Sequence, residues 1–219
     1  MQLVAWPGEA SAVQIIPLPH AGAPTAAQLT QLLDQLRSKA VTRVLTTAVD
    51  PAAMEPYRNA QFEVCSELVL LRRDLRQPIP PGGDTHRAQR RRWAELAVID
   101  AAAFGTFWAL DLAAIERAAE ATSSRRVRTV GEDHPVGYAV SGAAGAYGYL
   151  QRLAVDPEHW GHGHATALCL DSLAWMRRLG ARTAVVNTEH DNHRALALYD
   201  RLGFTPMAEG LYILEARLA

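Results

Sequence analysis

The sequence lacks an excess of charge of either sign and has only two cysteines. Its 219 residues include 22 Lys and Arg against 23 Asp and Glu, a formal net charge of -1. A chain with almost no net charge has no general electrostatic attraction to nucleic acid or anionic lipid. The arginine cluster from Arg87 to Arg92 is typical of a solvated helix face. We therefore expect neither nucleic acid nor a membrane as a partner. Cys65 and Cys169 lie far apart within apolar patterns, which is typical of small buried thiols and indicates a reducing compartment.

Long apolar runs are also absent. The longest, such as Ala101 to Leu110, are too short to span a membrane, and no basic residue precedes the short apolar run at the start of the sequence. We therefore expect a cytoplasmic protein without a membrane partner. What the sequence does have is an apolar fraction of 49%, enough to fill the core of one large domain or two small ones.

The stretch RQPIPPGGDTH, Arg76 to His86, marks the clearest break in composition. Its three prolines and two glycines exclude a continuous helix or a central strand. We place a linker at residues 76–85, which divides the chain into a first region, residues 1–75, and a second region, residues 86–219.

The first region predicts the order helix, strand, helix, strand. Leucines at helical spacing follow a candidate Thr25 cap over Thr25 to Lys39, and a β-rich run covers Val41 to Val49. A short helix near Ala52 to Ala60 and a strand at ELVLLRRDL, Glu67 to Leu75, complete the order.

The C-terminal end repeats this order with similar residues, which predicts a diverged tandem repeat. The stretch LLDQL is like LCLDSL, and Tyr57 has the same separation from Phe62 as Tyr199 has from Phe204. Chance similarity of two α/β segments is the alternative. The first copy lacks a glycine loop, because the stretch LPHAGAPT before its helix has no spacing comparable to GHGHA.

The second region predicts a complete α/β unit. Two amphipathic helices, the second with a candidate Asp111 cap, precede three strand-like runs broken by Gly, Asp and Pro, which indicate a meander. The elements expected next are a helix from about His162 to Leu179, a strand at Thr183 to Thr188, a helix from Asn192 to Leu202 and a strand pair near Leu211 to Leu218. We expect an α/β fold in which this unit is preceded by a partial α/β repeat.

The stretch HWGHGHA, His159 to Ala165, lies between an expected strand and an expected helix. Pro157 ends the strand, and Gly161 and Gly163 allow backbone angles and close approaches that other residues block. The helix then begins with free N–H groups directed back into the loop. This arrangement predicts an anion site, and pyrophosphate suits it because successive amides neutralise charge without a lysine.

The histidines in and after this stretch raise a second interpretation, a metal site. The candidate ligands are His159, His162, His164, His190 and His193. No HExxH helix, CxxC pair or paired carboxylate accompanies them, so they lack the pattern of a zinc site. We expect exposed loop histidines and no metal, and a histidine-rich metal-binding protein is the less favoured alternative.

Two motifs in the second region resemble those of the GNAT superfamily of acetyl-CoA-dependent N-acetyltransferases. The stretch LAVDPEHWGHGHATAL matches the family's acetyl-CoA motif at Val155, Pro157, Gly163 and Ala165. The stretch NTEHDNHRALALYDRLGF matches the second motif at Asn192, Ala195, Leu198, Tyr199, Gly203 and Phe204. The likeness covers about His86 to Ala219. It implies a GNAT fold, with a mixed, mainly antiparallel central sheet flanked by helices. One position departs from the family, because Trp160 stands where the motif has Gln or Arg.

The resemblance implies a role for each matching residue. Main-chain groups of Leu153 to Val155 would contact the pantetheine arm and the acetyl carbonyl. The loop from Gly161 to Thr166 would hold the pyrophosphate, and Asn192 would form a hydrogen bond with the cofactor's arm. The cofactor-binding residues are then Leu153, Ala154, Val155, Trp160, Gly161, His162, Gly163, His164, Ala165, Thr166 and Asn192.

The resemblance also assigns Tyr199 as the acid that protonates the thiolate, although a helix tyrosine at this spacing is often a core residue. Glu189, at the end of an expected strand, is the first candidate for the general base, with a solvated loop carboxylate as the alternative. His190 is the second candidate. Gln151 and Arg152 are expected only to orient an acceptor.

Three functions follow from these patterns. The favoured one is an N-acetyltransferase, monomeric or homodimeric, that transfers the acetyl group of acetyl-CoA to an amine of a small molecule or peptide. The second is a CoA-binding module without turnover, and the third is the histidine-rich metal-binding protein. The tandem arrangement is similar to that of the mycothiol synthases, with a degenerate first copy that we expect to cover a sheet edge or to wall the acceptor cleft.

Overall fold

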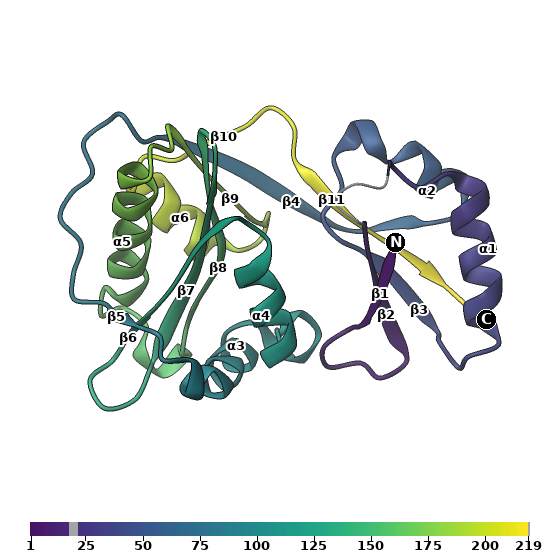
Figure 1. Cartoon of the computed structure of the whole chain (residues 1–219), viewed down its shortest axis with the longest axis horizontal. Helices are drawn as coiled ribbons and strands as arrows, with labels where there is room; N and C mark the ends of the chain where they lie inside the picture. Colours follow the sequence, from purple (N-terminus) through teal and green to yellow (C-terminus); the bar gives the residue numbers. More distant parts are fainter. Residues whose placement is uncertain (18–21, 219) are drawn as a thin grey trace. The chain divides into compact units, whose positions relative to one another are not determined.

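The computed structural model describes residues 1–17 and 22–218, and the chain forms two compact units (Figure 1). The first unit comprises Met1–Leu70, Asn187–Asn192 and Met207–Ala219, and the second comprises Leu71–Val186 and His193–Pro206. These units are not contiguous in sequence, so they do not follow the linear division at residues 76–85. That stretch contains no helix or strand, as its prolines and glycines predict.

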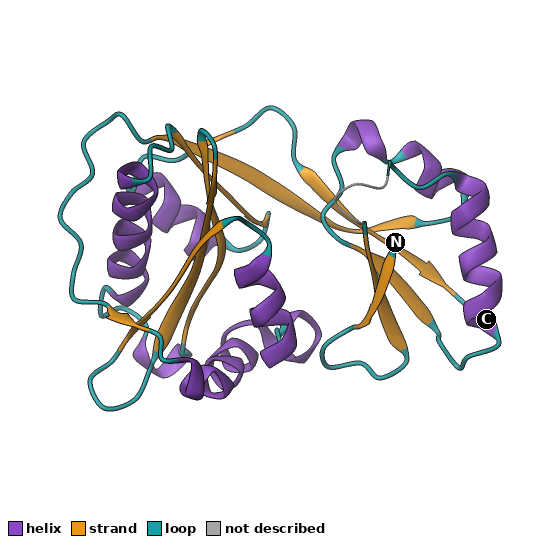
Figure 2. Ribbon diagram, in the orientation of Figure 1, coloured by secondary structure: helices purple, strands orange, loops and turns teal. Residues whose placement is uncertain are grey.

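The first unit contains a five-stranded part of the sheet with helices (Figure 2). Its sheet order is β1-β2-β3-β11-β4, in which β2 and β3 are parallel and the other neighbours are antiparallel. The elements are β1 (Gln2–Ala5), β2 (Ala12–Ile16), α1 (Ala26–Arg37), β3 (Arg43–Thr46), a 3-10 turn (Pro51–Ala53), α2 (Glu55–Asn59), β4 (Glu63–Asp74) and β11 (Leu211–Arg217).

Two expectations about strands are wrong. The order helix, strand, helix, strand omits β1 and β2, which precede α1; each has five residues or fewer, too short for a clear alternation of apolar residues. The expected C-terminal strand pair is also wrong, because β11 is one strand between β3 and β4, and β10 (Thr205–Pro206) pairs with β4 instead.

Helix α1 begins where the sequence predicts. The Thr25 hydroxyl accepts a hydrogen bond from the Gln28 amide at 3.3 Å, and the Gln28 side chain accepts one from the Thr25 amide at 3.0 Å. This capping box satisfies two N–H groups that the first turn leaves free. Residues 18–21, part of the stretch before the cap, lie outside the described residues. The apolar face of α1 buries Leu29, Leu33 and Leu36 in the core of the first unit.

The predicted repeat has matching local geometry in the two units. Tyr57 and Phe62 have ring centroids 5.6 Å apart, and Tyr199 and Phe204 have centroids 5.4 Å apart. In each pair the phenylalanine amide donates to the tyrosine carbonyl, at 3.0 Å and 2.9 Å. The residue before each phenylalanine has a positive φ, 63° at Gln61 and 76° at Gly203. The same helix-ending turn therefore occurs twice, which supports the repeat.

The second unit contains the mixed, mainly antiparallel sheet that the sequence predicts. Its strand order is β4-β9-β8-β7-β6-β5; β6, β7 and β8 form an antiparallel meander, and β8 and β9 are parallel. The strands are β5 (His86–Arg87), β6 (Ser124–Val130), β7 (Gly137–Ala144), β8 (Tyr147–Val155) and β9 (Thr183–Glu189, which continues into the first unit). The helices are α3 (Trp93–Trp108), α4 (Leu112–Glu120), α5 (His164–Arg178) and α6 (His193–Arg201).

Alternation along β7 determines which helix packs on which face of this sheet. Tyr138 and Val140 point to one face and share a core with Trp93 of α3 and with residues of α4. Ser141 points to the opposite face, where its hydroxyl donates to the Ser172 hydroxyl of α5 at 2.8 Å. Helices α3 and α4 therefore cover one face of the sheet, and α5 covers the other (Figure 2).

Strand β4 brings part of the first sequence region into the second unit. Leu71 and Leu75 are 2% and 0% exposed, and the Leu75 amide donates to the Arg182 carbonyl at 2.9 Å. Strand β10 pairs with β4 through Arg72 and Leu71, and β9 is the other neighbour of β4 in the sheet order. Residues before the linker therefore supply a strand of the second unit, which agrees with the expected role of covering a sheet edge.

No single helix among the described residues is long and apolar enough to cross a membrane. The helical segments Arg90–Trp108 and Leu112–Glu120 reach the length and apolar composition of a membrane span only when they are counted together, and the chain bends by 96° between them.

We predict that a fragment of residues 76–219 does not fold, because it lacks the strand that pairs with β10 and lies beside β9. Its unfolding by heat, followed by circular dichroism, should show no cooperative transition. A point variant tests the same contact in the full chain: Leu75→Ala should lower the free energy of unfolding by about 2–5 kcal/mol.

The control for this prediction is Arg76→Ala, the next residue along the chain. Its side chain is 77% exposed and pairs with Asp74, so the melting temperature should stay at the wild-type value. A fragment of residues 76–219 that unfolds cooperatively at the wild-type temperature would contradict the prediction.

Candidate active site

Strand β8 separates from β9 in its second half. The two parallel strands pair at Tyr147–Tyr149 with Thr183–Val185, and no further pairing between them occurs among the described residues. On its other side, β8 stays paired with β7 up to Val155, opposite Gly137. A register shift between Val140 and Ser141 leaves Gln151 of β8 without an opposite residue. Such a bulge bends the strand, so the predicted residues Leu153–Val155 have main-chain groups without a strand on the β9 side.

The loop after β8 leads directly into the N-terminus of α5. The Asp156 side chain caps a single 3-10 turn, Pro157–His159, and Gly161 and Gly163 follow with φ of 83° and 81°. These left-handed angles favour glycine, and a Cβ built on either glycine meets no atom within 4 Å, so the space beside them is open.

The first amides of α5 have no partner from a capping side chain. Gly163 is the N-cap and offers no side-chain acceptor, and the first intrahelical bond runs from the Ala167 amide to the Gly163 carbonyl at 2.9 Å. The amides of His164, Ala165 and Thr166 precede this bond. They carry the positive end of a fifteen-residue helix, which is an arrangement suited to an anion.

Trp160 braces the loop. Its indole Nε1 donates to the Val155 carbonyl at 2.8 Å, so its single donor links the loop to the end of β8. The guanidinium carbon of Arg194, from α6, lies 3.8 Å from the centroid of the indole ring. Although Trp160 departs from the family motif, its side chain therefore braces the loop.

The loop histidines are close together without forming a metal cluster. The rings of His162 and His164 have centroids 6.0 Å apart, and the His162 Nδ1 lies 3.3 Å from the His159 carbonyl oxygen. Partial burial, with the neighbouring His162 and His159, lowers the pKa of His164, so this imidazole is neutral at pH 7. Among the described residues, no group of three or more His, Cys, Asp or Glu side chains is placed to hold a metal ion.

The remaining predicted residues lie on or after β9 and on α6. Tyr199 is 4% exposed and packs against Phe204 in the second unit. Glu189 ends β9; its carboxylate accepts from the Thr188 hydroxyl at 3.3 Å, and its carbonyl accepts from the Asn192 amide at 3.2 Å. The Nε2 atom of His190 lies 3.5 Å from the Oε1 atom of Glu67.

The structure brings only some of these residues together. Leu153, Ala154, Val155 and the loop from Trp160 to Thr166 are contiguous in the second unit, which also contains Tyr199. Glu189 and Asn192 belong to the first unit. The assignments of Tyr199 as acid, Glu189 as base and Asn192 as a cofactor contact stay predictions.

A buried charged network that the sequence patterns did not predict lies beside the bulge in β8. Asp100 of α3 is 0% exposed, and the Arg152 guanidinium donates to its two carboxylate oxygens at 2.8 Å and 2.6 Å. The Tyr138 hydroxyl donates to the same carboxylate at 2.5 Å. Burial and then the charge of Asp100 raise the pKa of Tyr138 well above its ordinary value, so this hydroxyl remains a donor. Arg152 is therefore committed to Asp100 instead of orienting an acceptor.

This network also fixes the segment between α3 and α4. Arg152 donates to the Trp108 carbonyl at 2.8 Å, and Asp100 accepts from the Leu110 amide at 2.6 Å. Gly105, with φ 70° and ψ 171°, interrupts α3 just before this segment. The available sequence signal was Asp100 itself, a single carboxylate inside the apolar run LAVIDAAAF.

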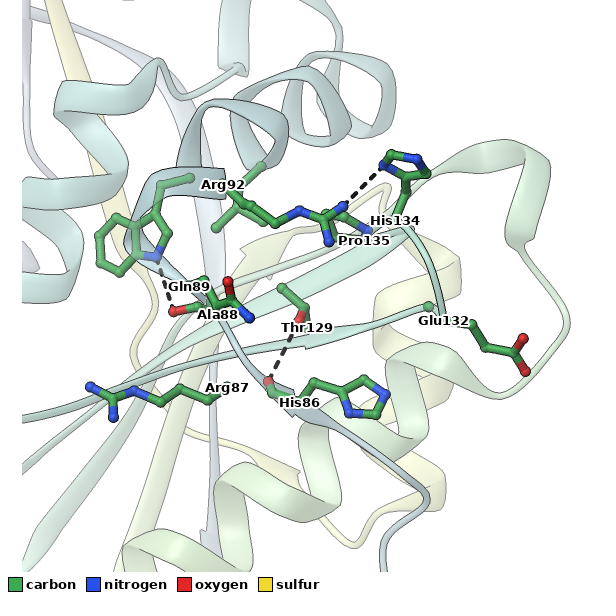
Figure 3. Close-up of a pocket in the computed structure, with 12 residues that line it drawn as sticks. His86, Arg87, Ala88, Gln89, Arg92, Thr129, Glu132, His134 and Pro135 are labelled. Carbon is green, nitrogen blue, oxygen red and sulfur yellow. Dashed lines mark hydrogen bonds between the residues drawn. The ribbon is translucent and has the colours of Figure 1, made fainter.

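A separate hollow of about 230 Å³ lies between β5, the start of α3 and the turn from β6 to β7 (Figure 3). Arg92 projects along it, donates to His134 Nδ1 at 3.0 Å and makes two bonds of 2.8 Å to Glu95. Arg90 pairs with Glu116 at 2.8 Å. Carboxylates thus neutralise two members of the arginine cluster, Arg90 and Arg92.

We predict that Asp100→Asn strongly destabilises the protein, because the buried Arg152 loses its counter-charge. The free energy of unfolding should fall by about 3–5 kcal/mol, measured by urea denaturation. Replacing both residues by leucine should recover part of this loss, since no buried charge then remains.

The matched control is Glu116→Gln, which removes an ion pair with Arg90 at the surface of the same unit. Exposed pairs contribute little, so this variant should unfold at the wild-type urea concentration. Equal stability of Asp100→Asn and Glu116→Gln would show that the buried pair does not support the fold.

Comparison with known proteins places these features in a family. The profile of the Acetyltransferase (GNAT) family matches residues 86–204, more than half of the chain. The N-alpha-acetyltransferase 30 of Schizosaccharomyces pombe is 46% identical over 57 residues, 26% of this chain and 38% of that protein. The mycothiol acetyltransferase of Geodermatophilus obscurus is 43% identical over 60 residues, 27% of this chain and 20% of that protein.

The fold has relatives among solved structures. A tandem GNAT protein from the clavulanic acid biosynthesis pathway superposes with a TM-score of 0.64, over 95% of this chain and 76% of that chain, at 15% identity. This likeness concerns the fold. The curated relatives match the present chain over less than half of their own lengths.

Proposed function

The chain belongs to the GNAT acetyltransferase family, and from this membership we propose that it transfers the acetyl group of acetyl-CoA to an amine. The proposed acceptor is a primary amine of a small molecule or a peptide. Two relatives, named as a mycothiol acetyltransferase and an N-alpha-acetyltransferase, are consistent with both acceptor classes. A cytoplasmic location and a monomeric or homodimeric state stay predictions from the sequence.

The backbone between β8 and α5 carries this proposal. Strand β8 has separated from its parallel neighbour β9, and two glycines in the left-handed conformation follow it. The N-terminus of α5 comes next and has no side-chain cap. The α5 amides suit the pyrophosphate of CoA, since they offer hydrogen-bond donors and the positive end of the helix dipole without a lysine. The unpaired side of β8 suits the pantetheine arm, which carries amides that pair with main-chain groups. The residues present therefore fit acetyl-CoA as a co-substrate.

The reaction needs three things from the protein: correct positioning, a donor of a proton to sulfur and an acceptor of the proton of the amine. Acetyl-CoA supplies a thioester; a C–N bond forms to the neutral amine as the C–S bond breaks, and the departing thiolate takes a proton. Main-chain groups at Leu153 to Val155 would hold the acetyl carbonyl, and loop amides from Gly161 to Thr166 would fix the phosphates. We propose that the Tyr199 hydroxyl donates the proton to sulfur and that Glu189 receives the proton of the amine.

A thermal shift experiment tests cofactor binding. Acetyl-CoA binds only the folded state, so a concentration of a hundred times Kd should stabilise the protein by about 2.7 kcal/mol and raise its melting temperature. CoA should act similarly, and zinc should leave the temperature unchanged. A shift with zinc and none with acetyl-CoA would reject this function in favour of the metal-binding alternative.

Tyr199→Phe tests the role of the acid. Loss of a proton donor should lower kcat by about a hundredfold with an amine that the wild type acetylates, while the Kd for CoA stays constant. Release of CoA followed with a thiol reagent measures kcat, and calorimetry measures Kd.

The chain offers a matched control, since Tyr57 has the same turn and the same phenylalanine neighbour in the first unit. Tyr57→Phe should leave kcat unchanged. If Tyr199→Phe also retains the wild-type kcat, the hydroxyl is not the proton donor, and Tyr199 serves the core alone.

A further inference from the structure

Arg194 lies over the loop that the proposed function assigns to the phosphates. It is an exposed residue in the first turn of α6, and its guanidinium carbon is 3.8 Å from the centroid of the Trp160 ring. Among the described residues, no carboxylate forms an ion pair with it. The positive charge of Arg194 is therefore held at the loop without a counter-charge from the protein.

The loop itself supplies no cation to bind an anion. Residues 156–164 contain no lysine or arginine, and their acidic members are Asp156 and Glu158. The Asp156 carboxylate is occupied, because it accepts from the Glu158 amide at 3.0 Å. His164 is neutral at pH 7, as described above. A permanent positive charge has to come from another segment, and α6 brings one.

The stack on Trp160 prepares Arg194 to bind a phosphate. A guanidinium whose face lies on an aromatic ring keeps the N–H groups along its edge available for hydrogen bonds. The indole is itself fixed, since its Nε1 donates to the Val155 carbonyl at 2.8 Å. Holding the long side chain in place before binding reduces the entropy that it would lose on contact with a ligand.

We propose that Arg194, positioned by Trp160, contacts the phosphate groups of acetyl-CoA. This inference rests on the proposed function and adds a residue to it. The motif position that Trp160 occupies has Gln or Arg in the resembling family, so the two side chains together replace one: Trp160 braces the loop, and Arg194 supplies the charge. The ligand class is a phosphorylated cofactor, and the chemistry is a charge-assisted hydrogen bond from guanidinium to phosphate oxygen.

The test compares CoA binding to the full-length wild type and to Arg194→Met by calorimetry. Loss of a charge-assisted contact should weaken CoA binding about tenfold or more. The difference in CoA affinity between the two proteins should shrink at high salt, because screening weakens the contact between Arg194 and the phosphate in the wild type. Binding of S-acetylpantetheine, which has no pyrophosphate or 3′-phosphate, should be the same for both proteins. A comparison with 3′-dephospho-CoA identifies the phosphate: the loss disappears if Arg194 contacts the 3′-phosphate and persists if it contacts the pyrophosphate.

The control is Arg201→Met, which makes the same change of charge on the same helix, about two turns along α6 from Arg194. It should bind CoA like the wild type. Trp160→Ala should weaken CoA binding as well, and adding Arg194→Met to it should cost little more, since the two residues act as a unit. Both arginines are exposed, so equal melting temperatures of the variants would show that the fold is intact.

The outcomes separate this inference from the function on which it rests. A wild type that does not bind CoA overturns the proposed function and this inference together. A wild type that binds CoA, with Arg194→Met binding as tightly as Arg201→Met, overturns this inference alone.

Discussion

The buried ion pair between Arg152 and Asp100 is the interaction on which the candidate site depends. It joins β8 to α3 beside the bulge in β8, at a carboxylate that is 0% exposed. The same strand continues into the loop before α5, so a shift of β8 would move the main-chain groups, the glycines and the helix terminus together. Because a buried charge is costly without its partner, this contact has one stable arrangement and fixes the strand's position.

In the proposed arrangement of the loop, the task of one side chain passes to two. An arginine or glutamine at the Trp160 position would brace the loop and also offer a polar group to the ligand. Here the indole uses its donor on Val155, and Arg194 lies over its ring from another helix. The change at one motif position therefore leaves the helix amides and the glycine geometry in place, because those features belong to the backbone.

The first sequence region is part of the second unit's architecture. Strand β4 contributes Leu71 and the adjoining Leu75 to that unit, and β11, from the end of the chain, lies between β3 and β4. The two sequence regions therefore each supply strands to both units. The repeated turn at Tyr57 and Tyr199 shows that the local geometry of the copies remains similar although the first copy has no glycine loop.

The sequence by itself determined the features that depend on neighbouring residues. These are the caps at Thr25 and Asp111, the amphipathic helices, the meander and the strand, glycine loop and helix at HWGHGHA, since each follows from local backbone preferences and periodicity. Only the tertiary structure decided the positions of β1 and β2, the partners of β4 and β11, the Asp100 to Arg152 pair and the Trp160 to Arg194 stack. The pairing of β1 with β2 is local, but these strands are too short for a clear pattern. The other contacts join residues far apart in the chain, and strand register and helix packing, which no local pattern records, determine which of them meet.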